Sequence, residues 1–306
     1  MSGPEAPSGT GRIYDIKRFA VHDGPGIRTV VFLKGCPLRC AWCHNPEGMS
    51  AAPDLSLTLM KCVGCGDCVR ACPNGAHSLP DVGVHEIDRT RCTLCGACVE
   101  ACVPGALRLY GREVSVEALL AEVSADRPFY EQSGGGVTLS GGEPLSQPAF
   151  AAAFLRACRA AGLHTALDTS GAVPWDAFEA VLPHTDLVLY DIKHIDPEAH
   201  RTWTGLDNVR ILDNLRRLGR AGVPIEVRIP CLPGVNDGDV LERIAVFLRE
   251  IPSLTAVRLL PYHDFARSKF AAIGREDTMP RVERPGPEAM AAMRAVMVRH
   301  GLRTAE

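Results

Sequence analysis

The cysteines carry the most specific chemical signal in this chain, and three of them stand close together. Cys36, Cys40 and Cys43 have the spacing Cys-x3-Cys-x2-Cys. Three thiolates at this spacing can hold three corners of an iron–sulfur cubane, and no fourth cysteine lies near enough in sequence to complete an ordinary four-cysteine site. One iron is then open to a further ligand, as is the metal of a catalytic zinc site. The stretch predicts a cluster that binds and activates a small molecule.

Eight further cysteines form two runs, each with the spacing Cys-x2-Cys-x2-Cys-x3-Cys. Bacterial ferredoxins with two clusters have this spacing, and in them the fourth cysteine of each run binds the other cluster. The same crossing would give two 4Fe–4S sites, one from Cys62, Cys65, Cys68 and Cys102, the other from Cys92, Cys95, Cys98 and Cys72. Pro73 follows Cys72 as expected, whereas the second run has its proline one place late, at Pro104. Structural zinc is the alternative for paired Cys-x2-Cys units.

Polar or glycine-rich segments follow several apolar runs that we expect to be strands. They are Ser140-Gly-Gly-Glu-Pro144, Asp168-Thr-Ser-Gly171, Asp191-Ile-Lys193 and Leu259-Leu-Pro-Tyr-His263. Two glycines let a ligand approach the backbone, and two neighbouring carboxylates call for a cation or a cationic ligand. Taken singly, each segment is equally well explained as a glycine turn, a helix cap or a solvated strand end.

The elements that position these residues alternate between strand and helix. Apolar runs predict six strands, at 29–33, 136–140, 165–168, 186–191, 224–229 and 256–260. Amphipathic stretches predict helices at 116–123, 148–161, 175–182, 208–221, 240–250 and 287–300. Such alternation favours parallel strands with right-handed crossovers, and ligands then bind at the carboxyl ends of the strands. We expect an α/β fold, an open partial (β/α)6 TIM-like barrel, in which residues 53–111 form an inserted ferredoxin-like domain with two 4Fe–4S clusters.

Composition sets wider limits. The chain has 306 residues, of which 46% are hydrophobic and 23% charged, as is ordinary for a soluble globular protein. A formal net charge of -3 gives no electrostatic case for nucleic acid or an anionic membrane as a partner. Residues 1–12 lack the pattern of a signal peptide and predict a disordered tail, which leaves 13–52 and 112–306 for the barrel. Thirteen cysteines without a secretion signal point to metal in a reducing cytoplasm.

The flanks of the three-cysteine loop make the pattern more specific. His22-Asp-Gly-Pro-Gly-Ile-Arg-Thr-Val-Val-Phe-Leu-Lys-Gly-Cys36 precedes it, and His44-Asn-Pro-Glu47 follows it. With these flanks the chain resembles the radical S-adenosylmethionine (SAM) enzymes, and among them the activating enzymes of glycyl radical enzymes. The resemblance covers Tyr14 to His300. It is nearest to activators that carry a ferredoxin-like insert.

This resemblance implies a site. The catalytic residues would be the cluster ligands Cys36, Cys40 and Cys43. SAM would contact Trp42, Cys43, His44, Gly141, Gly142, Glu143, Asp168, Asp191, Ile192, Lys193 and His263. A monovalent cation is a further candidate, beside Asp168, Thr169 and Asp191. Cys158 and Cys231 are ordinary thiols in this interpretation.

The resemblance also implies a function. Such an oxidoreductase reductively cleaves SAM to a 5′-deoxyadenosyl radical, which removes a hydrogen from a glycine Cα of a partner glycyl radical enzyme. The electron donor would be a flavodoxin or a ferredoxin, and the chain would be a cytoplasmic monomer. The insert clusters would relay electrons or serve docking. Two alternatives stay open: a radical SAM enzyme for a small-molecule substrate, and a simple electron carrier.

Overall fold

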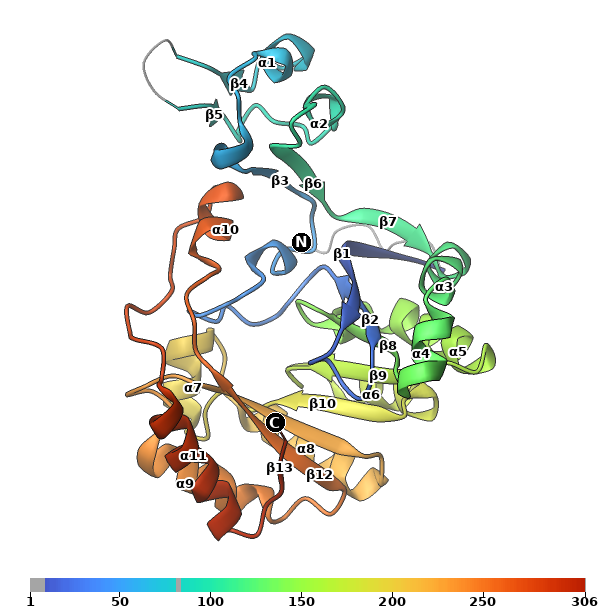
Figure 1. The fold of residues 1–306 in the computed structure, drawn as a ribbon, viewed down its shortest axis with the longest axis vertical. Coiled ribbons are helices and arrows are strands. Elements are labelled where there is room, and N and C mark those ends of the chain that lie inside the picture. Colours follow the sequence, from blue (N-terminus) through green and yellow to red (C-terminus); the bar gives the residue numbers. More distant parts are fainter. Residues whose placement is uncertain (1–8, 81–83, 306) are drawn as a thin grey trace.

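A nine-stranded sheet forms the centre of the molecule in the computed structural model, which describes residues 9–80 and 84–305 (Figure 1). Its strand order is β13-β12-β11-β10-β9-β8-β2-β1-β7. Pairing is parallel from β13 to β2, whereas β1 and β7 run antiparallel at one edge. The strands are β1 Thr10–Ala20, β2 Arg28–Leu33, β7 Arg112–Ser115, β8 Gly136–Gly141, β9 His164–Thr169, β10 Leu187–Asp191, β11 Ile225–Cys231, β12 Leu254–Pro261 and β13 Thr304–Ala305.

Helices flank the curved sheet on its outer side, with α3, α4 and α5 at one side of the view and α9 and α11 at the other (Figure 1). They are α3 Val116–Ser124, α4 Arg127–Ser133, α5 Pro148–Ala160, α6 Trp175–Val181, α7 Pro197–Thr204, α8 Val209–Ala221, α9 Gly238–Leu248, α10 Arg267–Ala272 and α11 Pro287–Arg299. No helix in the described part of the chain is both long and apolar enough to cross a membrane.

The six predicted strands and the six predicted helices are all confirmed, each end within two residues. The central strands were readable because both of their faces are covered, which favours continuous apolar runs. Val30, Val31, Val137 and Leu139, for example, have no exposed surface. The mostly parallel α/β sheet is therefore established.

Strand β1 was not predicted. It begins at Thr10, inside the segment 1–12 that the sequence assigned to a disordered tail, and Thr10–Ile13 pairs with Arg112–Ser115 of β7. The pairing partner lies about a hundred residues away in the sequence. The residues around Thr10–Arg12 therefore gave no indication that this segment is an ordered strand. The rest of the predicted tail, residues 1–8, lies outside the described residues.

The insert forms a separate lobe at one end of the molecule, next to β7 and α10 (Figure 1). It begins with β3 (Asp54–Leu57) and ends with β6 (Leu107–Tyr110), which pair antiparallel from Asp54↔Tyr110 to Leu57↔Leu107. Between them lie two short helices, α1 (Asp67–Ala71) and α2 (Ala97–Glu100), and a two-stranded ladder of β4 (His77–Ser78) and β5 (Glu86–Ile87).

Ion pairs with buried members connect the base of the insert to the domain of the nine-stranded sheet. The fully buried Nζ of Lys34, at the end of β2, donates to Asp54 Oδ2 at 2.7 Å and to the carbonyl of Glu47 at 2.7 Å. Arg275, which follows α10, reaches the same carboxylate at 3.1 Å. Asp54, the first residue of β3, therefore joins the insert to two separate parts of the main domain.

Candidate active site

The three-cysteine loop follows β2 and is held by backbone hydrogen bonds from both sides. Gly35 N donates to Gly48 O at 2.8 Å and Cys36 N to Met49 O at 3.1 Å. On the other side, Arg39 N and Ala41 N donate to carbonyls at the end of α7, at 2.7 and 2.9 Å. All three thiols line one cavity of about 500 Å³, a volume typical of small-molecule sites.

The same cavity collects most of the residues named from the sequence. Its wall includes Cys36, Cys40, Trp42, Cys43, His44, Gly141, Gly142, Asp168, Thr169, Asp191, Lys193 and His263. These residues come from the cysteine loop and from the carboxyl ends of β8, β9 and β10, with His263 just after β12. The chain thus brings five separate segments to one place.

Glu143 and Ile192 do not line this cavity. Glu143 has no exposed surface, and its carboxylate accepts hydrogen bonds from Ser170 Oγ at 2.6 Å, Ser170 N at 2.9 Å and Thr169 Oγ1 at 2.9 Å. It therefore joins the end of β8 to the end of β9. Ile192 packs in the core, and its backbone N–H donates to Arg228 O at 2.9 Å.

The two glycines of the β8 end do more than admit a ligand. A Cβ on Gly142 would lie 2.4 Å from Gly48 O and 2.5 Å from Gly35 O, and one on Gly141 would lie 2.2 Å from Leu33 O. The space beside them is therefore already filled by the backbone of β2 and of the cysteine loop. These glycines set how closely the loop lies against β8.

The carboxylates of the cavity have cationic partners within the chain. Arg228 Nη1 lies 3.2 Å from Asp168 Oδ1, and Lys193 Nζ donates to Asp191 Oδ2 at 2.8 Å. Burial raises the pKa of Asp168, while Arg228 acts in the opposite direction. Burial alone would lower the pKa of Lys193, but Asp191 and Cys40 raise it. The charge of the two aspartates is thus compensated without the candidate monovalent ion, which stays a prediction.

Aromatic rings form another part of the cavity wall. The rings of His44 and His263 stack with centroids 4.1 Å apart, and Trp42 packs against Trp203 at 5.8 Å. His44 Nε2 lies 3.1 Å from His263 O, and burial lowers the pKa of His44 to about 4. His263 Nδ1 is buried without a hydrogen-bond partner, so it can bond a ligand in the cavity.

Lys17, His22 and Asp23 also line the cavity, and sequence reasoning assigned them no role. They come from β1 and the turn after it, and Asp23 Oδ1 lies 3.8 Å from Arg228 Nη2. The signal was present, because His22 and Asp23 open the segment that precedes the cysteine loop.

The buried thiols suit a thiolate-bound metal. Burial raises the pKa of Cys43 to about 12 and also raises those of Cys36 and Cys40. Burial therefore makes the thiolate forms of these cysteines costly. Iron binds the thiolate and displaces the thiol proton, and the bond to iron offsets that cost. No cysteine in the described residues forms a disulfide, and all three stay available as ligands.

The eight cysteines of the insert line two small cavities, four in each. Cys62, Cys65, Cys68 and Cys102 border one, and Cys72, Cys92, Cys95 and Cys98 border the other. Each half also has the same kind of turn after its fourth cysteine. Ala76 N donates to Cys72 Sγ and Ala106 N donates to Cys102 Sγ, both at 3.2 Å. The late proline at Pro104 therefore leaves the second turn unchanged.

Comparisons with known proteins show which family the chain resembles. A model of the radical SAM superfamily matches residues 30–246. The isethionate sulfite-lyase activating enzyme of Desulfovibrio desulfuricans is 44% identical over 279 residues, 89% of each chain. The trans-4-hydroxy-L-proline dehydratase activating enzyme of Clostridioides difficile is 41% identical over 282 residues, 91% of this chain and 93% of that protein. The structure of Streptococcus suis SuiB bound to precursor peptide SuiA shares the fold, with a TM-score of 0.54 at 9% identity over 90% of this chain and 47% of that chain.

This chain belongs to the radical SAM superfamily, among the activating enzymes of glycyl radical enzymes. Membership implies SAM and a 4Fe–4S cluster as cofactors and a glycyl radical enzyme as protein partner.

Proposed function

We propose that the cavity at the carboxyl ends of the parallel strands is where SAM binds, with Cys36, Cys40 and Cys43 holding the 4Fe–4S cluster. The observation that carries this proposal is the meeting of these thiols with Gly141, Gly142 and the aspartates in one wall. When bound, the cluster would supply the one electron that breaks the S–C5′ bond of SAM, giving methionine and a 5′-deoxyadenosyl radical, which would remove a hydrogen from a glycine Cα of the partner and become 5′-deoxyadenosine.

The chain's own residues position the ligand. Backbone groups at Gly141 and Gly142 would hold the methionine end of SAM, while Trp42, His44 and His263 would flank its adenosine. The ion pairs Asp168–Arg228 and Asp191–Lys193 keep charged groups fixed in a buried wall, where they cost little reorganisation during reaction. Holding the reacting atoms close is the main contribution of such a site.

We further propose that residues 53–111 are a ferredoxin-like domain with two more 4Fe–4S clusters, which makes three in all. Each cavity of the insert has one of the two ligand sets that the ferredoxin pattern gives. The insert would receive electrons from a flavodoxin or a ferredoxin, or hold the partner in place.

Anaerobic reconstitution tests these assignments. The reduced protein with SAM should form 5′-deoxyadenosine, and Cys36→Ala should abolish it, whereas Cys62→Ala should retain it with dithionite as donor. Cys158→Ala is a matched control, because Cys158 is buried in the core away from all three cysteine groups. Undiminished deoxyadenosine in Cys36→Ala would refute the barrel site, and an unchanged iron content in Cys62→Ala would refute the insert cluster.

The partner is tested by the glycyl radical itself. Incubation with a cognate glycyl radical enzyme should give a glycyl radical signal in the EPR spectrum. Turnover of SAM with a small molecule, and no radical on any partner, would favour the small-molecule alternative.

A further inference from the structure

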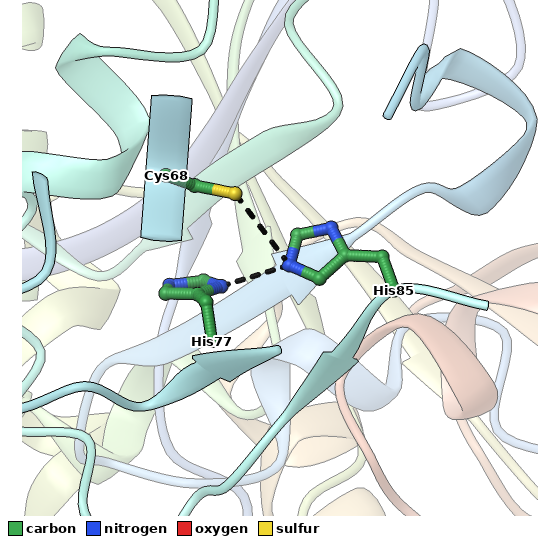
Figure 2. A group of neighbouring side chains, drawn as sticks. All are labelled: Cys68, His77 and His85. Carbon is green, nitrogen blue, oxygen red and sulfur yellow. Dashed lines mark hydrogen bonds between the residues drawn. The ribbon is translucent and has the colours of Figure 1, made fainter. Parts of the chain in front are cut away.

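Two histidines of the insert lie against the sulfurs of one cysteine group. His85 Nδ1 is 3.6 Å from Cys62 Sγ, and His85 Nε2 is 3.6 Å from Cys68 Sγ. His77 Nδ1 lies 2.9 Å from the same Nε2, so the imidazoles are hydrogen-bonded to each other (Figure 2). Both residues are buried, with 5% and 6% of their surface exposed.

The pair also spans the two cavities of the insert. His85 lines the cavity of Cys62 and Cys68, and His77 lines that of Cys72 and Cys92. In the described chain, however, no histidine nitrogen hydrogen-bonds a sulfur of the second cavity. The backbone bonds to Cys72 and Cys102 are matched between the halves, so the contacts of His85 are a hydrogen-bonding difference between the two sites.

The thiolates and the contact with His77 together favour one arrangement of protons on this pair. A cysteine bound to iron can only accept a hydrogen bond, and each ring nitrogen of His85 faces such a sulfur at 3.6 Å, Nδ1 that of Cys62 and Nε2 that of Cys68. Only Nε2 has a nearer partner, His77 Nδ1 at 2.9 Å, so we assign the proton of a neutral His85 to Nδ1, facing Cys62. Nε2 then has a free lone pair, which accepts the N–H of His77 Nδ1. His77 therefore acts through His85 by fixing its tautomer and ring orientation, as outer partners do for metal ligands.

We propose that His85 donates a hydrogen bond to the Cys62 thiolate, and that this makes the cluster of Cys62, Cys65, Cys68 and Cys102 the more easily reduced of the two insert clusters. His77 is a positioning residue for this bond. The inference rests on the proposed two-cluster insert. A donor on a ligand sulfur stabilises the more negative, reduced state and so raises the reduction potential. An electron entering the insert then settles first beside His85.

The test is an EPR-monitored redox titration of the full chain in which Cys36, Cys40 and Cys43 are changed to Ala, so that only insert clusters contribute. Two resolved potentials are expected. His85→Leu should lower the higher one by about 59 mV, a tenfold change in the ratio of reduced to oxidised cluster, and leave the other unmoved. His85→Gln keeps an N–H donor, so its potential should lie between those of His85→Leu and the unsubstituted histidine. His77→Ala should lower the potential by less than His85→Leu does. His184→Leu, on the barrel, is the matched control.

Iron analysis separates the possible failures. About eight irons per chain with no shift in His85→Leu or His77→Ala would overturn this inference and leave the two-cluster insert standing. Fewer irons in the starting protein would instead overturn the two-cluster insert. Zinc in the protein that is lost in His85→Gln would identify a zinc site at Cys68, His77 and His85. This result would overturn both the hydrogen bond from His85 and the two-cluster insert. If His85→Leu does not retain its iron, the His77→Ala and His85→Gln titrations decide.

Discussion

The substitution Gly142→Ala tests how the cysteine loop is positioned. The added Cβ would meet the carbonyl oxygens of Gly48 and Gly35 at 2.4 and 2.5 Å, whereas carbon–oxygen contacts in proteins are about 3.3 Å or longer. The backbone on one side must therefore retreat by about 1 Å. Both carbonyls flank the loop, so the three thiols move with them. Overpacking of this kind destabilises a fold by about 1–3 kcal/mol.

Two measurements follow from this displacement. Misplacement by about 1 Å should lower the rate of 5′-deoxyadenosine formation about 100-fold. The iron-free chain should also unfold at a lower temperature, by about 2–4 °C for each kcal/mol lost. Gly286→Ala is the matched control, since nothing lies within 4 Å of its added Cβ and its φ of -71° suits any residue. If Gly142→Ala slowed SAM cleavage but left the iron-free chain as stable as the control, ligand approach alone would explain the glycine and the steric reasoning would fail.

Two further substitutions test the buried charges. Arg228→Met leaves Asp168 buried without its cation and should cost about 3–5 kcal/mol of unfolding free energy at neutral pH. Burial raises the pKa of Asp168 to about 6 with Arg228 in place, and removing this cation raises it further, so the loss should shrink as the pH falls towards about 6; a loss independent of pH would contradict this assignment. Asp54→Ala should likewise cost about 3–5 kcal/mol, because Lys34 is left buried and unpaired, and limited proteolysis should then cut near the base of the insert. Asp67→Ala breaks an exposed ion pair and should change the free energy of unfolding by at most about 1 kcal/mol. If Asp54→Ala and Asp67→Ala changed the free energy of unfolding equally, the role of burial would be refuted.

Local sequence patterns were enough to predict the parallel strands and their helices. Strands that are covered on both faces consist of continuous apolar runs, and the helices have amphipathic stretches. They were not enough for β1, whose half-buried residues alternate irregularly and whose order depends on distant β7. The short helices α4, α7 and α10 were missed as well, since helices of six to eight residues give little periodicity, although α6, with seven residues, was predicted.

The candidate site shows the same division. Spacing identified the cysteine groups, and strand ends located most of the cavity wall. The contacts between side chains could not be predicted from the sequence. The pairing of Asp168 with Arg228 and the burial of Glu143 against Ser170 depend on which strand ends become neighbours. The His77–His85 contact had one weak signal, two histidines within a cysteine-rich stretch, but no spacing rule that assigned them to either cluster.

The pairing of β3 with β6 brings the two ends of the insert together. A Cβ on Gly111 would lie 3.0 Å from Pro53 Cα, so the chain leaves the barrel and returns to it at nearly one point. None of the parallel strand pairings runs through this junction. The lobe is thus inserted at one point: a short turn from Pro53 to Gly111 would close the main domain without it, provided that Asp54, the partner of the buried Lys34, is kept. A different cluster-bearing lobe could be exchanged at the same junction while the SAM cavity kept its walls.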